Sequence, residues 1–170
     1  KAAREMRERV FTLLEEKALH GRGLTVSTFH AFCARVLRDW GERIIGTNTF
    51  TIYDTADQRS AVKAAIRACE LNESNWKPAS VLAAISAAKN KLIDVETFQE
   101  EASDFYSKSI AKIYRAYENI LRGNDAVDFD DLLLKTAQLL FGDEEVRHRL
   151  QERYQYLMID EYQDTNHTQF

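Results

Sequence analysis

The sequence predicts a mainly α-helical protein that carries a short parallel sheet. Apolar residues recur at spacings of three and four over most of the 170 residues, which is the period of an amphipathic helix. The sequence has one proline and six glycines, which are too few for the many turns of an all-β fold. Short runs of β-forming residues stand far apart and alternate with helices, which favours parallel strands over hairpins.

Seven helices are expected from this period. An apolar stripe at residues 3, 6, 10, 13 and 14 predicts the first helix, over residues 2–19. Thr55 and Gln58 have the spacing of a capping box, which predicts that a helix begins at Thr55. Residues 98–121 form the longest periodic run and read as one helix. The remaining helices are expected near residues 28–40, from 78, from 128 and from 143.

Three segments read as strands: Leu24–Ser27, Phe50–Tyr53 and Tyr156–Ile159. The last is a continuous apolar run, as expected of a strand that is buried on both faces. A parallel sheet of so few strands would be poorly covered. We therefore expect the chain to be a piece of a larger protein that supplies the rest of the sheet.

Composition restricts the class of protein only weakly. Cys33 and Cys69 lie among apolar residues without a nearby partner, so we expect two reduced core thiols in a cytosolic protein. No run approaches the ~18 apolar residues of a membrane span. The formal net charge is −4, but residues 1–70 carry 12 Lys and Arg against 9 Asp and Glu, so any contact with phosphate is expected in that half.

The strongest chemical signal is the acidic pair that follows the last apolar run. Asp160 and Glu161 come directly after Tyr156–Ile159, and ligands bind at the carboxyl ends of strands in open α/β sheets. Nucleotide hydrolysis needs one carboxylate for Mg²⁺ and a second that orients and deprotonates water. The same acids could instead cap a helix, so the pair by itself leaves both interpretations open.

Longer strings around this pair resemble a known family. Residues 160–166 read DEYQDTN, which resembles the signature of UvrD/Rep/PcrA-type superfamily 1 helicases. Four other strings are similar to family strings in the same order: KAAREMRERV at 1–10, VSTFHAFC at 26–33, ISAAKN at 85–90 and DFDDL at 128–132. The resemblance covers nearly the whole chain.

The resemblance implies the domain organisation and the partners. Family members are ATP-driven translocases with two RecA-like P-loop NTPase domains and two helical insertions. Residues 1–45 and 126–170 would belong to the first RecA-like motor domain, and residues 46–125 to its inserted helical subdomain. The implied partners are single-stranded DNA, duplex DNA and the remainder of the motor, in a cytoplasmic, nucleoid-associated bacterial protein without a membrane segment.

The resemblance also assigns residues to ATP hydrolysis. The implied cofactors are ATP and Mg²⁺. Asp160 would bind Mg²⁺ and Glu161 would be the general base, with Gln163 and Asp164 supporting the site. No Gly-x-x-x-x-Gly-Lys-Ser/Thr loop occurs in the sequence. Because phosphoryl transfer depends on positioning and charge stabilisation, we expect this chain alone to be inactive.

A second set of residues is assigned to DNA. Thr28 and His30 would lie near the single-stranded backbone, where they can donate to phosphate oxygens. Arg4 and Lys89 are further candidates for phosphate contact.

Two other patterns have simpler explanations than a site. Helix capping explains the acids of Asp128–Asp131 better than a metal site does. The helical spacing of Phe105, Tyr106, Tyr114 and Tyr117 favours a core over a base-stacking platform. Two alternatives to a helicase fragment stay open, namely a helicase–nuclease subunit of recombination type and a non-enzymatic helical module for DNA binding or protein interaction.

Overall fold

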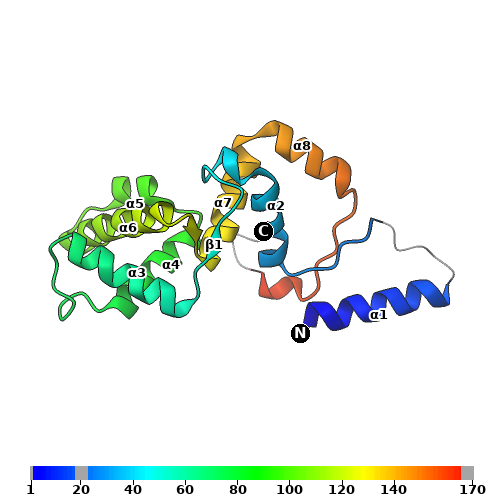
Figure 1. Ribbon diagram of the computed structural model, residues 1–170, viewed down its shortest axis with the longest axis horizontal. Helices are drawn as coiled ribbons and strands as arrows, with labels where there is room; N and C mark the ends of the chain where they lie inside the picture. Colours follow the sequence, from blue (N-terminus) through cyan, green and yellow to red (C-terminus); the bar gives the residue numbers. More distant parts are fainter. Residues whose placement is uncertain (1, 18–22, 166–170) are drawn as a thin grey trace.

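Helices dominate the computed structural model, which describes residues 2–17 and 23–165. Figure 1 shows two groups of helices side by side, with the first helix lying apart from both. The α-helices are α1 (Ala2–Glu16), α2 (Phe29–Trp40), α3 (Thr55–Ala68), α4 (Pro78–Lys89), α5 (Val95–Glu101), α6 (Phe105–Gly123), α7 (Phe129–Gly142) and α8 (Glu144–Arg153). Two 3-10 helices, η1 (Gly41–Arg43) and η2 (Tyr162–Asp164), and two strands, β1 (Thr51–Ile52) and β2 (Ala126–Val127), complete the described elements. The prediction of a mainly α-helical protein is confirmed.

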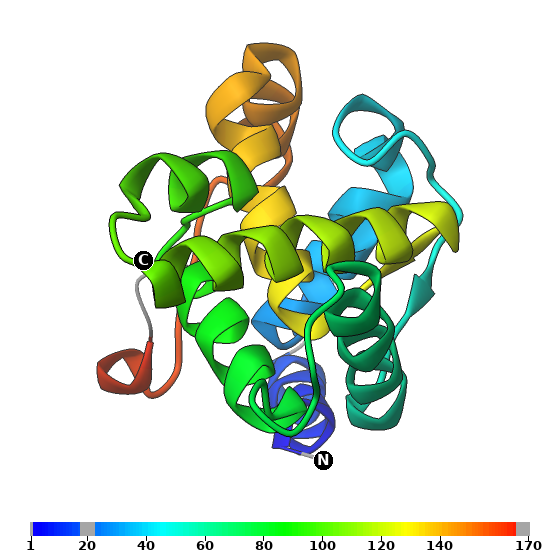
Figure 2. The same cartoon turned by 90° about the vertical axis from the view of Figure 1, so that its left-hand side faces the viewer.

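Helices α3 to α6 enclose one hydrophobic core, the α3–α6 core. Val62, Ile66, Ile85 and Ile113 are fully or almost fully buried in it. Figure 2 looks at this group end-on and shows α6 crossing in front of the others. Tyr114 and Tyr117 of α6 are also buried, which confirms them as core residues, whereas Phe105 and Tyr106 at the start of α6 are exposed.

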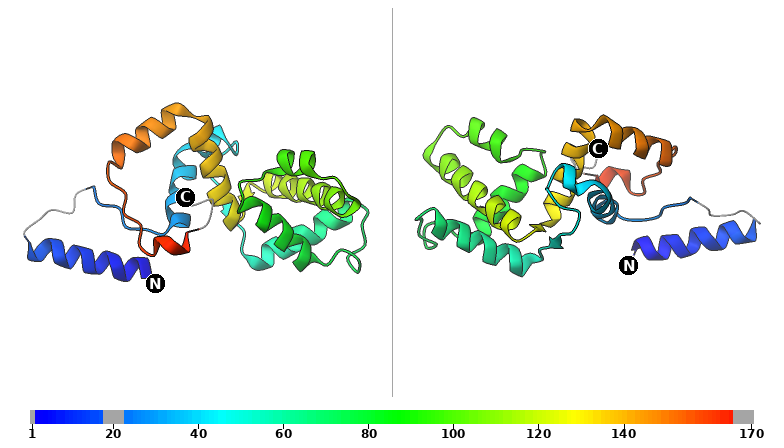
Figure 3. Two further views of the ribbon diagram at one scale, coloured as in Figure 1. Left: turned by 180° about the vertical axis from the view of Figure 1, so that it is seen from behind. Right: turned by 45° about the horizontal axis from the view of Figure 1, so that its top comes forward.

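A second core, the α2/α7/α8 core, lies beside the first. Leu37 of α2, Leu132 of α7 and Val146 of α8 are buried together there. Both views in Figure 3 show α7 between α2 and the α3–α6 group. Since α7 packs against α2 and also contacts α4, it connects the α2/α7/α8 core to the α3–α6 group.

A two-stranded parallel sheet joins the two cores. Thr51 pairs with Ala126 and Ile52 pairs with Val127. The chain passes between the cores at this point, because Ala126 belongs to the α3–α6 core and Val127 to the α2/α7/α8 core. The predicted strand over Phe50–Tyr53 is therefore present at its centre, and it pairs with a segment that the sequence did not identify as a strand.

Two of the predicted strands are wrong for this chain. Leu24–Ser27 and Tyr156–Ile159 have no regular secondary structure, and Leu157 and Met158 are 76% and 90% exposed. The physical reason is that a strand is stable only when its backbone N–H and C=O groups meet a neighbouring strand. Within residues 2–17 and 23–165, neither segment is paired in a sheet.

The helix boundaries differ from the prediction in two places, because aspartates cap the helices there. The run over 98–121 is broken into α5 and α6 because Asp104 caps α6, accepting from the Ser107 N–H at 2.9 Å. The capping box at the start of α3 is made by Asp54 and Asp57, one residue earlier than expected. The last residues of the predicted first helix lie outside the described part of the chain.

None of the described helices combines the length and the apolar character that crossing a membrane requires.

Candidate functional site

Asp160 and Glu161 lie in an exposed turn directly after the apolar segment Tyr156–Ile159. Asp160 accepts a hydrogen bond from the Glu161 N–H through Oδ1, at 3.1 Å. Glu161 has φ +51° and ψ +44°, the left-handed region that residues other than glycine rarely adopt. This backbone turn makes both carboxylates accessible to solvent at the surface.

The next residues complete this turn. The Gln163 side chain donates from Nε2 to Glu161 Oε2, and the Thr165 hydroxyl donates to the Tyr162 carbonyl at 2.7 Å. Glu161 precedes η2 without a side-chain capping bond to it. The structure therefore brings Gln163 to Glu161, and the alternative in which Glu161 serves as a helix cap does not fit. Asp164 lies in η2, and its side chain is outside the described part.

Thr28 and His30 lie at the start of α2. Thr28 is exposed and caps the helix, because its Oγ1 accepts from the Ala31 N–H at 3.2 Å. A hydroxyl that accepts one hydrogen bond still has its own hydrogen to donate. The ring of His30 contacts the ring of Phe129 of α7 edge-on, with centroids 5.9 Å apart and an interplanar angle of 69°.

Arg4 lies on α1, which Figure 1 shows apart from α2. Its guanidinium makes an exposed ion pair with Glu8, one turn further along the helix, at 3.1 Å. Surface pairs of this kind contribute little to stability. The structure therefore leaves Arg4 accessible but does not bring it to Thr28 or His30.

The expectation that Lys89 contacts DNA is wrong for this structure. Its side chain is fully buried at the end of α4. The Nζ atom lies 2.7 Å from Glu118 Oε1, 2.8 Å from Asp128 Oδ2 and 2.8 Å from Asp131 Oδ1. A charge that is buried and paired with three carboxylates cannot reach a phosphate in solvent. We call these four residues the Lys89 cluster.

The acids of the Lys89 cluster are held by other bonds as well. Asp128 caps α7 by accepting from the Asp131 N–H at 2.7 Å, and Asp131 accepts in return from the Asp128 N–H at 3.2 Å. The Tyr117 hydroxyl donates to Asp128 Oδ2 at 2.9 Å. The capping role expected for Asp128 is confirmed, and within the described residues no group of His, Cys, Asp and Glu has the arrangement of a metal site.

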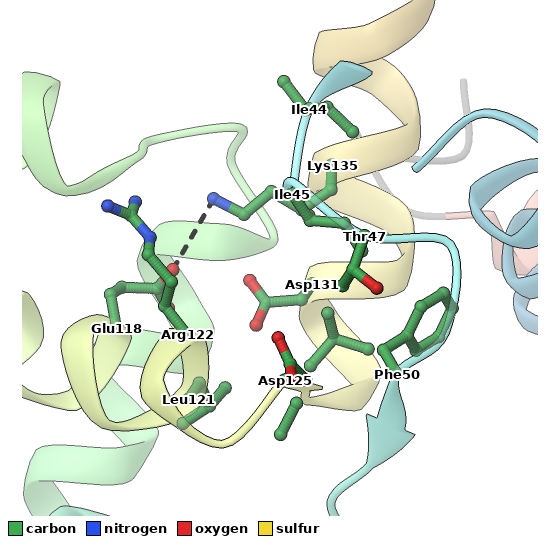
Figure 4. A pocket seen from close by; sticks show the side chains of 12 residues that line it. Ile44, Ile45, Thr47, Phe50, Glu118, Leu121, Arg122, Asp125, Asp131 and Lys135 are labelled. Atoms are coloured by element: carbon green, nitrogen blue, oxygen red, sulfur yellow. Dashed lines mark ion pairs between the residues drawn. The ribbon is translucent and has the colours of Figure 1, made fainter. Parts of the chain in front are cut away.

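A recess beside the β1–β2 sheet opens onto one side of this cluster. Figure 4 shows Lys135 of α7 reaching towards Glu118 of α6, and the two charged groups lie 3.5 Å apart. Asp131 also lines the recess, opposite Phe50 and Ile45 of the segment that leads into β1. The recess is lined by α6, by α7 and by the segment that leads into β1.

Comparison with known proteins identifies the family. The model of the UvrD/REP helicase N-terminal domain matches residues 1–170, which is the whole chain. The chain belongs to the UvrD/REP helicase family.

Curated members of the UvrD/REP family resemble the chain along its whole length. It is 41% identical over 170 residues to the ATP-dependent DNA helicase PcrA of Leuconostoc citreum and 40% identical to PcrA of Bacillus subtilis (strain 168). Identity to PcrA of Staphylococcus epidermidis is 39% over the same length. The match covers 100% of this chain but only 22–23% of these relatives, so the chain spans less than a quarter of their length.

The position of Lys89 along its helix carried one signal of its burial. Lys89 follows Val81 and Ile85 at spacings of four, and both of those residues are buried. A lysine that continues the buried stripe of a helix is expected to need a buried acid. The three acids come from α6 and α7, which are 29 to 42 residues away in sequence, so their identity could not be read from the spacing.

Burial and neighbouring charges shift the pKa values of Lys89, Asp128 and Asp131 in different directions. Burial alone would lower the pKa of Lys89, but Asp131, Asp128 and Glu118 outweigh it and hold that pKa well above its ordinary value. Burial raises the pKa of Asp131 to about 7, against the attraction of the Lys89 ammonium. Burial acts on Asp128 in the same direction, but the adjacent ammonium prevails and its pKa lies below the ordinary value.

Replacing Lys89 by methionine should destabilise the chain strongly. Lys89→Met keeps most of the side-chain volume but leaves the buried carboxylates without their cation, and breaking a buried ion pair costs about 3–5 kcal/mol. Lys91→Met is the matched control, because Lys91 is exposed two residues further along; a surface change of this kind costs less than about 0.5 kcal/mol. Urea unfolding followed by circular dichroism measures both. Equal midpoints for the two variants would contradict the buried position of Lys89.

The raised pKa of Asp131 should make stability fall between pH 5 and pH 7. The unfolded chain releases this proton near the ordinary value of 3.8, whereas the folded chain holds it until about pH 7. The contribution of this bound proton to the free energy of unfolding is therefore complete below pH 4. That contribution is lost as pH rises towards 7, by at most about 1.4 kcal/mol per pH unit. The lowered pKa of Asp128 acts below pH 4, outside this window.

Unfolding free energies at half-unit pH steps test this dependence on Asp131. Asp131→Asn should flatten the slope between pH 5 and pH 7, while Glu100→Gln, on the exposed face of α5, should keep the wild-type slope. An unchanged slope in Asp131→Asn would show that another group is responsible. The charged or titratable groups that face Asp131 are Lys89, Tyr114, Tyr117, Glu118, Asp128 and Lys135.

Proposed function

We propose that this chain is part of the first motor domain of an ATP-dependent DNA helicase, which couples ATP hydrolysis to translocation on single-stranded DNA and to duplex unwinding. The observation that carries the proposal is the exposed pair Asp160 and Glu161, in a chain whose whole length matches the UvrD/REP helicase N-terminal domain. The curated relatives are named ATP-dependent DNA helicases.

In this proposal the two hydrophobic cores correspond to two subdomains. Residues 1–45 and 126–170 belong to the RecA-like motor domain, and residues 46–125 form its helical insertion. The change of core between Ala126 and Val127 supports the second boundary. At the first boundary Phe50 still packs in the α2/α7/α8 core, which favours a crossing a few residues later, near Ile52.

Asp160 and Glu161 would carry the hydrolytic chemistry. Two adjacent exposed carboxylates fit Mg²⁺, which prefers oxygen ligands and is commonly held by one or two carboxylates together with substrate phosphates and water. Asp160 would hold the ion, and bound Mg²⁺ would supply positive charge that offsets the charge of the ATP phosphates. Glu161 would orient the attacking water and accept its proton, with Gln163 fixing the Glu161 carboxylate and Asp164 supporting the site.

The exposed apolar segment before this pair supports a missing neighbour. Leu157 and Met158 are exposed although they are large and apolar. A contiguous apolar run at the surface marks an interaction site. We propose that the remainder of the motor supplies strands on both sides of Tyr156–Ile159, which would bury these side chains and bring Asp160 and Glu161 to the edge of a sheet.

Thr28 and His30 would contact the backbone of single-stranded DNA. Both lie in the first turn of α2 or at its cap, where the unpaired N–H groups and the helix dipole favour an anion. The chain as a whole has a formal charge of −4. Binding of DNA by this chain alone should therefore be weak, with a Kd of roughly 10⁻⁴ M or higher at physiological salt. The whole protein would act on DNA in the bacterial cytoplasm.

Glu161→Gln should abolish most ATP turnover in the full-length helicase that contains this chain. Removing a general base costs about 10²- to 10⁴-fold in rate. Glu152→Gln, at an exposed glutamate on α8, is the matched control and should keep wild-type turnover. Phosphate release with saturating single-stranded DNA measures the rates, and this 170-residue chain alone should release no phosphate. If the 170-residue chain alone hydrolyses ATP, and Glu161→Gln abolishes that hydrolysis, the expected inactivity of the chain is refuted.

His30→Ala should weaken binding of this chain to a labelled oligothymidylate. Loss of one phosphate contact is expected to raise the Kd by roughly threefold to tenfold, which corresponds to about 1 kcal/mol. His148→Ala, at an exposed histidine on α8, should leave the Kd unchanged. Fluorescence anisotropy over a series of salt concentrations measures both. Equal affinities for the two variants would remove His30 from the DNA-binding site.

A further inference from the structure

Two of the sequence strings that resemble the family are bonded to each other. Lys89 and Asn90 end helix α4, and Asp128–Asp131 begin helix α7. Lys89 pairs with Asp128 and Asp131, and the Asn90 side chain donates from Nδ2 to Asp130 Oδ1 at 2.9 Å. All three acids in this turn are thus bonded to two consecutive residues of α4. We call this contact the α4–α7 clamp.

The clamp surrounds a residue that touches the proposed DNA segment. Phe129 lies between Asp128 and Asp130, is 49% exposed, and contacts the ring of His30 edge-on. His30 is the second residue of α2. A continuous physical path therefore leads from the end of α4, through the first turn of α7, to the imidazole of His30.

We propose that Lys89 and Asn90 are positioning residues that set the orientation of His30 through the first turn of α7. This inference rests on the proposed function of His30 in DNA contact. Its consequence is that the helical group α3–α6 acts on DNA binding without touching the strand there, because α4 fixes the turn that Phe129 occupies.

Electrostatics explain why this turn depends on α4. Asp128 and Asp131 lie three residues apart at the start of α7, where like charges repel each other. The Lys89 ammonium pairs with both buried acids, offsets their mutual repulsion and fixes their side-chain geometry. A buried ion cluster is weak evidence for stability but can specify one arrangement of packed helices. Here it specifies the rotation of the first turn of α7, and so the direction in which Phe129 points.

Other bonds keep the helical group and α7 together as one body. The Gln138 side chain donates to Asp94 Oδ2 at 2.9 Å, linking α7 to the cap of α5. Lys135 pairs with Glu118 of α6 at 3.5 Å. Helix α7 is bonded to the helical group at its first turn and again further along its length, so it does not slide independently of that group. A displacement of α4 therefore moves the first turn of α7, and Phe129 moves with it.

The ring signals of His30 test the clamp directly. Proton NMR of the 170-residue chain records its four histidines, and His30→Gln identifies the His30 signals. Phe129→Leu removes the neighbouring ring and should shift them. Phe105→Leu is a matched control, because Phe105 is also an exposed first residue of a helix that follows a capping aspartate, Asp104; it should leave them in place.

Lys89→Met and Asn90→Ala then test the positioning role. Both should shift the His30 signals towards their Phe129→Leu positions and raise the Kd for oligothymidylate by roughly threefold to tenfold. If Lys89→Met does not fold, Asn90→Ala carries the test, since it removes a partly buried bond and no buried charge. A folded variant with unchanged His30 signals would overturn the inference. Shifted signals with unchanged Kd would also overturn it, provided that His30→Ala itself weakens binding.

The two proposals fail in different ways. If His30→Ala leaves the Kd unchanged, His30 does not contact DNA and the proposed function of this residue fails. The NMR shifts in Lys89→Met and Asn90→Ala would still report whether the clamp positions the His30 ring.

Discussion

The fold depends on one buried ammonium. Lys89 is enclosed by Glu118, Asp128 and Asp131, which belong to α6 and the start of α7. Desolvating these charges is costly, and only close contact with several partners at once offsets that cost. The cluster therefore favours the arrangement in which the three helices meet here, and it links the α3–α6 group to α7.

Helix α7 carries the consequences of this constraint. Its buried face packs against α2, while its first turn is held by α4 and α6. The chain crosses between the cores at β1 and β2, where only two residue pairs form a sheet. So small a sheet cannot hold two groups of helices in place by itself. The ion cluster and the side-chain bonds of α7 supply the rest of the connection.

The segment that carries the proposed nucleotide site differs from the Lys89 cluster, because no distant part of the described chain pairs with it in a sheet. The apolar run before Asp160 and Glu161 is exposed, and local hydrogen bonds hold the turn that carries the two acids. Thr28 and His30, by contrast, lie at the start of α2, which packs against α7. We therefore propose that the side chains assigned to DNA are already in place in this chain, whereas the acids assigned to hydrolysis need neighbouring strands.

The sequence by itself determined most of the helices and the family, and it carries the proposed chemistry of the acidic motif, because each is encoded in residues close together along the chain. Amphipathic periods gave the helices, and the strings DEYQDTN and VSTFHAFC indicated the helicase family. Only the tertiary structure decided the role of Lys89, the pairing of β1 with β2, and the unpaired state of Tyr156–Ile159. Each of these depends on which distant segments meet, and neither periodicity nor local motifs specify that.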